Sequence, residues 1–180
     1  MAYYGTLTGA NAYFANRLHS SAWSDSSATD RPKALTEATI LIDSLNYRGV
    51  KHSVWSIMYE LQSTGNYTKI LTNPPTRDEL IAADADQDLE FPRGQDTSVP
   101  TEIEWACYEV ALAILEGFDP EDAVEKTNIL SQAYSSVRTT YADGFLSQEY
   151  LAYGIPAARV WNWLKPRLCD SRIIKLSRAD

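Results

Sequence analysis

Histidine and clustered glycine, which many enzymes use at their active sites, are scarce in this sequence. Only two histidines occur, His19 and His52, and both lie in polar, loop-like surroundings outside any motif. The eight glycines never cluster, so a backbone cradle for a phosphate group is not expected. No G-x-S-x-G, Walker or H-E-x-x-H motif occurs. The sequence therefore predicts a protein that is not an enzyme and that needs no cofactor.

Cysteine is also rare. The two cysteines, Cys107 and Cys169, are far apart and form neither a metal-binding spacing nor a disulfide framework. Cys107 falls within an apolar helical pattern, which predicts a small buried hydrophobic side chain. This cysteine usage fits a reducing cytoplasm.

An alternating acidic run suggests a calcium site at first sight. Its acids are Asp84, Asp86, Asp88 and Glu90. An EF-hand loop counted from the first of them needs glycine at its sixth position and glutamate at its twelfth, where this chain has Leu89 and Gln95. We therefore expect no metal site here, but a solvated acidic face or loop.

Long apolar runs are missing as well. No stretch approaches the ~18 apolar residues of a membrane span. The N-terminal segment has neither the basic start nor the apolar centre of a secretion signal. We expect a protein that does not contact membranes and that is made in a cytoplasm. With 180 residues, of which 44% are hydrophobic and 22% charged, the chain is long enough to form one domain with its own core.

Positive charge is unevenly distributed in a chain with a formal net charge of −8. Residues 77–125 contain fifteen acids and two bases, whereas residues 156–180 contain six bases and two acids. The acidic body disfavours a general nucleic-acid coat, because phosphate binding needs clustered lysine and arginine. The basic C-terminal segment has two interpretations: an interaction tail that docks on an acidic neighbour, or a solvated basic helix.

Helical periodicity dominates the remaining pattern, and it is strongest after Pro100, where apolar residues recur from Ile103 to Leu115 before a C-capping Gly117. A serine-rich loop is expected at residues 19–30, and an irregular segment at 91–94. Two further helices are predicted by their starts alone, one after an N-cap at Thr8 and one at Pro120. Four more are predicted with both ends: about Pro32 to Tyr47, about residues 55–61, Thr76 (as the cap) to Ala85, and Pro156 to Leu164.

The period changes to two beyond Asn128. Residues 134–141 alternate as one strand, Asp143-Gly144 is a turn signal, and residues 145–150 are suited to return as a hairpin partner. The expected fold is mainly α: a small helical bundle with a β-hairpin or extended arm and an extended C-terminal tail. We assign the helical domain to residues 1–168, with a β-hairpin near residues 132–150, and the tail to residues 169–180.

Aromatic residues are plentiful, with eleven tyrosines and five tryptophans. They coincide with bases in one C-terminal group: Arg159, Trp161, Trp163, Lys165 and Arg167. Such a group could stack on single-stranded nucleic acid, or its rings could belong to a protein–protein interface or to the core. Because the chain is acidic, we favour the second interpretation and take Trp161 and Trp163 as candidate interface aromatics.

Three segments together resemble a known family. They are FPRGQDTSVPTEIEWACYEVALAILEGFDPE (residues 91–121), YGTLTGANAYFANRLHSSAWSDSSATDRPKALTEATILIDSL (4–45) and GIPAARVWNWLKPRL (154–168). They cover about half of the chain. In this combination and order the chain resembles head-to-tail connector (adaptor) proteins of tailed bacteriophages, often labelled DnaT-like single-stranded DNA-binding proteins. Residues 51–89 depart from that pattern, because they are longer and more acidic than the family's usual connection.

The resemblance implies a structural role in the neck of a phage particle, reached from the host cytoplasm during assembly. The chain would form a ring of typically about twelve copies between the portal protein and a tail or nozzle protein. Genomic DNA would pass through its centre without sequence-specific binding, helped by an acidic lining that repels phosphate. The alternative, which follows from the family label, is a single-stranded DNA-binding replication accessory protein.

An adaptor also needs an arm that reaches a neighbouring protein. The C-terminal segment has the required alternation of apolar and basic residues, and we assign portal docking to it as a hypothesis. The residues concerned are Arg172, Ile173, Ile174, Lys175, Leu176 and Arg178.

Overall fold

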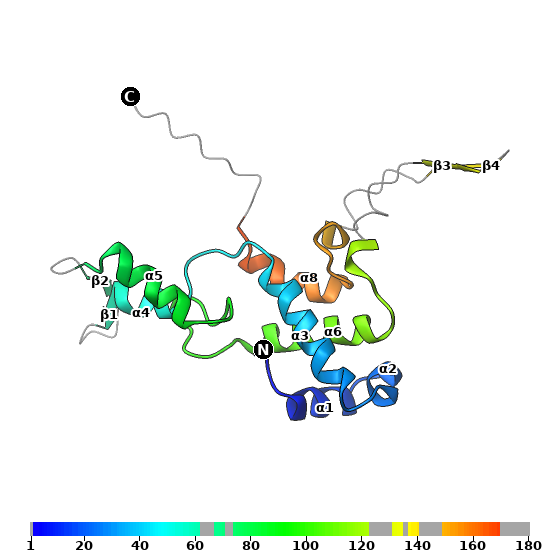
Figure 1. The fold of residues 1–180 in the computed structure, drawn as a ribbon, viewed down its shortest axis with the longest axis horizontal. Helices are drawn as coiled ribbons and strands as arrows, with labels where there is room; N and C mark the ends of the chain where they lie inside the picture. Colours follow the sequence, from blue (N-terminus) through cyan, green and yellow to red (C-terminus); the bar gives the residue numbers. More distant parts are fainter. Residues whose placement is uncertain are drawn as a thin grey trace.

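A computed structural model describes residues 2–61, 67–70, 74–122, 131–134, 137–140 and 149–169. The α-helices are α1 (Leu7–Ala15), α2 (Ser21–Asp25), α3 (Asp30–Asp43), α4 (His52–Met58), α5 (Arg77–Asp86), α6 (Thr101–Leu115) and α8 (Ala158–Leu164). Short 3-10 helices are η1 (Glu149–Tyr153) and η2 (Lys165–Arg167), and the strands are β1 (Tyr59–Leu61), β2 (Tyr67–Lys69), β3 (Ser131–Tyr134) and β4 (Val137–Thr140). The predicted mainly α fold is confirmed (Figure 1).

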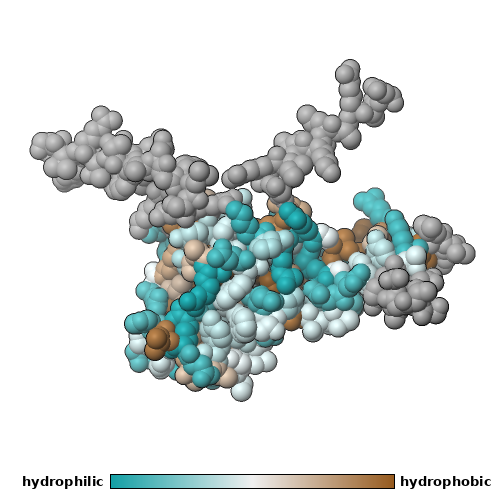
Figure 2. All heavy atoms as spheres, turned by 180° about the vertical axis from the view of Figure 1, so that it is seen from behind, coloured by the Kyte–Doolittle hydropathy of each residue, from teal (hydrophilic) through white to brown (hydrophobic). Residues whose placement is uncertain are grey.

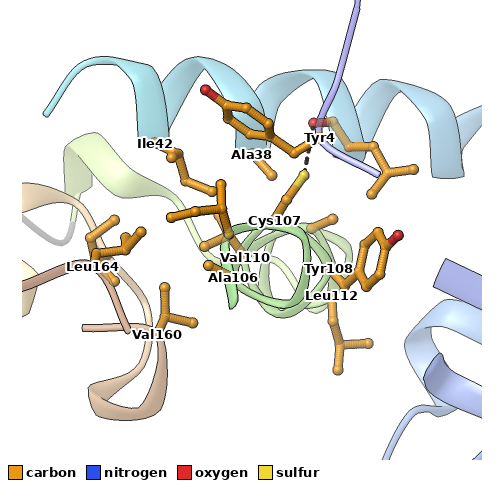
Figure 3. Close-up of a cluster of buried hydrophobic side chains, with 14 of the residues drawn as sticks. Tyr4, Ala38, Ile42, Ala106, Cys107, Tyr108, Val110, Leu112, Val160 and Leu164 are labelled. Carbon is orange, nitrogen blue, oxygen red and sulfur yellow. Dashed lines mark hydrogen bonds between the residues drawn. The ribbon is translucent and has the colours of Figure 1, made fainter. Parts of the chain in front are cut away.

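Helix α6 forms the centre of the bundle, in contact with α1, α2, α3 and α8 (Figure 1). Apolar residues occur around most of its circumference, which is the pattern of a helix buried on several sides. Ile103, Ala106 and Val110 are fully buried. Ile42 of α3 and Leu164 of α8 approach α6 from two different directions (Figure 3). The helix therefore joins the N-terminal and C-terminal thirds of the chain in one core.

The end of α6 follows its sequence signals. Gly117 has a φ of 93°, and its N–H donates to the carbonyl of Ile114 at 3.0 Å. The N–H of Phe118 donates to Ala113 at 2.9 Å, which completes a Schellman-type ending. The predicted glycine cap is confirmed. A further helical segment begins at Pro120, as predicted, and the carboxylate of Asp119 accepts the N–H of Glu121 at 2.9 Å.

The N-terminal helices differ from the prediction in two places. Helix α1 is capped by Thr6, not by Thr8, because the Thr6 hydroxyl accepts the N–H of Gly9 at 2.9 Å. The serine-rich segment that was expected to be a loop contains helix α2. Trp23 of this helix is buried against Phe14, with ring centroids 4.7 Å apart. Tertiary burial of the indole thus outweighs the loop preference of the surrounding serines.

Helices α4 and α5 and strands β1 and β2 form a lobe beside the bundle (Figure 1). The short helix expected around residues 55–61 ends at Met58, and the chain continues as β1, with Tyr59 opposite Lys69 of β2. Because aromatic and apolar residues suit both helix and strand, the pattern could not place this boundary. Helix α5 begins as predicted, with a capping box between Thr76 and Glu79.

The β3–β4 hairpin is placed differently from the prediction. Residues 134–141 were expected to form one continuous strand, whereas Tyr134 and Val137 are paired with each other on opposite strands. The period-two alternation is the same on both arms of a tight hairpin, so it does not locate the turn. The predicted turn at Asp143-Gly144 and most of the return strand lie outside the described residues, and Tyr150 belongs to η1.

The described C-terminal segment closes the bundle. Helix α8 buries Val160, Trp161 and Leu164, and η2 follows where the sequence indicated a break at Pro166. Leu168 then forms an antiparallel bridge with Tyr47. This pairing explains why α3 ends at Asp43 and does not extend to Tyr47 as expected. Seen from behind, hydrophilic side chains cover much of the surface and the hydrophobic areas are separate from one another (Figure 2).

Candidate interaction surface

Three rings form a partly exposed row across helices α1, α6 and α8, which we call the aromatic ridge: Tyr13, Trp105 and Trp163. The ring centroids of Tyr13 and Trp105 lie 6.3 Å apart, and those of Trp105 and Trp163 lie 6.0 Å apart. Trp105 is 39% exposed although it belongs to the most buried helix of the fold. Exposed tryptophan is costly in water and is typical of protein interfaces.

A buried ion-pair network lies beside the ridge. The Glu109 side chain is 5% exposed and accepts two hydrogen bonds from Arg17, at 2.6 and 2.7 Å. Its Oε1 also accepts the Tyr13 hydroxyl at 2.6 Å and lies 3.3 Å from the guanidinium of Arg159. A buried carboxylate is tolerated only with such partners. Glu109 therefore fixes α1 and α8 against α6, and with them the rings of the ridge.

This network shapes the electrostatics of the ridge. Burial, and then the hydrogen bond to Glu109, raise the pKa of Tyr13 to about 12, so the phenol is neutral at physiological pH. One carboxylate thus faces two guanidinium groups. The charge of Arg159, whose side chain is 60% exposed, is not fully balanced by Glu109.

The C-terminal segment is anchored at its base by backbone pairing. The N–H of Arg48 donates to the carbonyl of Arg167, and the N–H of Cys169 donates to Asn46, both at 2.9 Å. Arg167 also lies 3.6 Å from the carboxylate of Glu102 and 5.9 Å from the ring centre of Phe91. Two backbone hydrogen bonds and these side-chain contacts fix where the chain leaves the bundle towards residue 170.

Arg93 stabilises the same region from the other side. Its guanidinium donates to the carbonyls of Gly49 at 2.6 Å and Arg48 at 3.1 Å, and it pairs with the carboxylate of Glu90. It also lies over the ring of Tyr47 at 5.8 Å. The segment that receives Leu168 is therefore held in a defined conformation.

Helix α5 presents a second, acidic surface. None of its residues is buried, and Ile81 is 56% exposed. Lys51 approaches the carboxylate of Asp84 at 3.6 Å and donates to the carbonyl of Gln87 at 3.0 Å. Lys51, which precedes α4, thus holds the start of the acidic run, whereas Asp86 and Asp88 are exposed. No group of acids, histidines and cysteines in the described part of the chain could hold a metal ion.

The two aromatic residues singled out from the sequence have different positions. Trp161 is 6% exposed and belongs to the core, where its ring stacks on the exposed Tyr153 at 4.9 Å. Its burial fits the core interpretation of the aromatic group and not its role as a candidate interface aromatic. Trp163 is half-buried and lies in the aromatic ridge. The proposed docking residues Arg172, Ile173, Ile174, Lys175, Leu176 and Arg178 lie outside the described residues.

Sequence reasoning missed the outward position of Trp105 and the role of Glu109. The apolar pattern from Ile103 to Leu115 did not single out Trp105, although Trp105 follows Ile103 by two residues and so lies off the main stripe of the helix. This offset was the available signal. Glu109 gave no signal, because its partners Arg17 and Arg159 are remote in the sequence.

The cysteines and histidines have structural surroundings. Cys107 is fully buried, as predicted, and its thiol contacts the Leu35 carbonyl at 3.5 Å (Figure 3). Burial raises the pKa of this thiol to about 12. Cys169 is exposed, and both cysteines are free. Nδ1 of His52 lies 2.8 Å from the carbonyl of Gly94, where it stabilises the contact between α4 and the irregular segment.

Within the described ranges, no helix is both long and apolar enough to cross a membrane. No family model, no curated protein sequence and no solved structure matches this chain.

Proposed function

We propose that the chain is a structural head-to-tail connector subunit, which forms a ring between a phage portal and the tail. The proposal comes from the resemblance of residues 4–45, 91–121 and 154–168 to phage adaptor proteins. In this proposal the partners are the portal, a tail or nozzle protein and further copies of the chain, and its place is the neck of the virion.

The observation that best supports the proposal is the anchored base of the C-terminal segment. The backbone bonds of Arg167 and Cys169 to residues 46–48 fix the point from which residues 170–180 continue. Those residues carry three bases, Arg172, Lys175 and Arg178, between apolar neighbours. A fixed base would direct whatever follows Cys169 to one side of the bundle, which fits the assignment of portal docking to this part of the chain.

Removal of residues 170–180 tests the assignment of the arm. The variant ends after Cys169, so it retains the bridge between Tyr47 and Leu168 and every described core residue. We expect an unchanged thermal unfolding temperature and loss of binding to portal from the same phage in a co-sedimentation assay. A full-length R172E/K175E/R178E variant should lose binding too, whereas Lys33→Glu, which changes an exposed residue of α3, should retain it. Full portal binding by the truncated chain would refute the arm assignment.

The second candidate function is single-stranded DNA binding, and the aromatic ridge is the observation in its favour. Trp105 and Trp163 lie beside Arg159, and such groups can stack on bases and pair with phosphates. Fluorescence anisotropy with a labelled single-stranded oligonucleotide would distinguish this function from the connector function. The connector proposal expects no binding at physiological salt, and a replication factor would bind with affinity that falls steeply as salt rises.

A further inference from the structure

Helix α5 has an outward face that no other described element covers. Asp78, Ile81, Ala82 and Ala85 are exposed and recur at the spacing of one helix face. Asp78, Asp86 and Asp88 have no ion-pair partner among the described residues, unlike Asp84, which pairs with Lys51. The face therefore combines an apolar centre at Ile81 with a negative rim.

The aromatic ridge has the complementary composition. Trp105 and Trp163 offer apolar rings, and the exposed guanidinium of Arg159 adds positive charge that Glu109 does not fully balance. Arg167 does not add to this charge, because its guanidinium already lies within 4 Å of the carboxylates of Glu102, at 3.6 Å, and Asp96, at 3.8 Å. An isoleucine flanked by aspartates and a pair of indoles beside the exposed Arg159 are suited to each other in both hydrophobic and charge terms.

The two surfaces lie on different parts of the molecule. Helix α5 belongs to the lobe that it forms with α4, whereas the ridge lies where α1, α6 and α8 meet in the bundle (Figure 1). One copy cannot bring its own two surfaces together without dismantling this arrangement. A second copy of the chain, however, carries both.

We infer that the aromatic ridge of one copy receives helix α5 of the next copy. Such a contact is heterologous, because it joins two different patches, and it repeats from copy to copy until the rotation closes a ring. The inference rests on the proposed function for the closed ring, and it names the lateral contact that the ring would use. Charge contributes to the contact, so added salt should weaken it.

Two surface variants test this pairing. D78R/D86R reverses the rim of α5, a helix in which nothing is buried, and Arg159→Glu reverses the charge of the ridge. Because Arg159 also contacts Glu109, Trp105→Ala serves as a second ridge variant that leaves this ion pair in place. Matched controls are Asp25→Arg on α2 and Lys33→Glu on α3, both exposed and outside the two surfaces.

Sedimentation velocity of the full chain, without portal, over about a hundredfold range of concentration gives the readout. The wild type and the controls should associate progressively, and each surface variant alone should remain monomeric. A mixture of D78R/D86R with Trp105→Ala retains one intact pair of surfaces and creates no new charge pair, so it should form dimers and nothing larger. This dimer limit distinguishes a head-to-tail contact from nonspecific association.

Several outcomes would overturn the inference. They are a wild type that is monomeric at every concentration, variants that associate like the wild type, or a mixture that forms no dimer. A ridge that binds an oligonucleotide through Arg159, with association unaffected by its reversal, would assign the surface to nucleic acid instead. The sedimentation assay contains no portal, so it tests the lateral contact alone. If the mixture forms dimers but the chain does not bind portal in a separate test, the connector proposal is refuted and the lateral contact is retained.

Discussion

Glu109 has a carboxylate that lies inside the bundle and meets donors from both ends of the chain. Glu109→Gln removes the charge that Arg17 and Arg159 face, without changing the size of the side chain. Breaking a buried pair from one side is costly, but both guanidiniums reach solvent, so we expect a loss of about 2 kcal/mol in the free energy of unfolding.

Urea denaturation measures that change. Glu37→Gln on α3 is the matched control, because Glu37 is exposed and its replacement should leave the urea midpoint nearly unchanged. Equal midpoints for the Glu109 and Glu37 variants would show that the network contributes little to stability.

The Cys107 thiol predicts how stability depends on alkaline pH. Burial raises its pKa from an ordinary value of 9.0 to about 12, and the pKa of Tyr13 is raised from 10.0 to about 12. Between the ordinary pKa and the raised pKa, each group has lost its proton in the unfolded chain but keeps it in the folded chain. The free energy of unfolding therefore falls as pH rises through this range, and these two groups do not affect it at lower pH.

The free energy of unfolding, measured at a series of pH values above 9, tests this expectation. Cys107→Ala should show a shallower decline than the wild type, since one of the contributing groups is gone. A Cys169→Ala control should match the wild type, because that thiol is exposed. A flat profile in the wild type would contradict the burial argument.

At the scale of elements, α5 and α8 contribute to stability in different ways. Leu164 of α8 is fully buried, and Leu164→Ala should cost about 3 kcal/mol through the cavity that it leaves. Ile81 of α5 is 56% exposed, so Ile81→Ser should leave thermal unfolding nearly unchanged. Differential scanning calorimetry of the two variants compares them directly. A comparable loss for Ile81→Ser would mean that α5 is covered within the monomer.

Elements with local signals were predictable from sequence. The capping box of Thr76 and Glu79 located the start of α5, and Gly117 located the end of α6, because both depend on neighbours within a few residues. Helix α2 was not predicted, because it is stabilised by the burial of Trp23 against Phe14 and not by local sequence signals. The end of α3 was misplaced for a similar reason, namely the bridge between Tyr47 and Leu168. Long-range contacts decided these boundaries.

The candidate interaction surface also depends on long-range contacts that the sequence does not show. The C-terminal aromatic group was recognisable, but its division into a buried Trp161 and a half-buried Trp163 depends on how α8 packs on α6. The pairing of Trp163 with Trp105 and Tyr13 joins three helices that are distant in sequence. Composition predicted an interaction surface, and only tertiary packing could show which rings would form it.

For the whole molecule, the uneven distribution of charge is the property most relevant to assembly. The acids of residues 77–125 include the exposed face of α5, whereas the bases of residues 156–180 lie beside the ridge or follow it in the chain. A chain with such opposed regions is suited to repeated head-to-tail contacts with its own copies and to contacts with a further partner.

The mass of the purified chain by light scattering, alone and then mixed with portal from the same phage, tests the connector proposal most directly. We expect a stoichiometric ring of the chain on the portal, whether or not the free chain is monomeric at the same concentration. A monomer that ignores the portal and instead shifts its mass on addition of single-stranded DNA would contradict the proposal and favour a replication accessory protein.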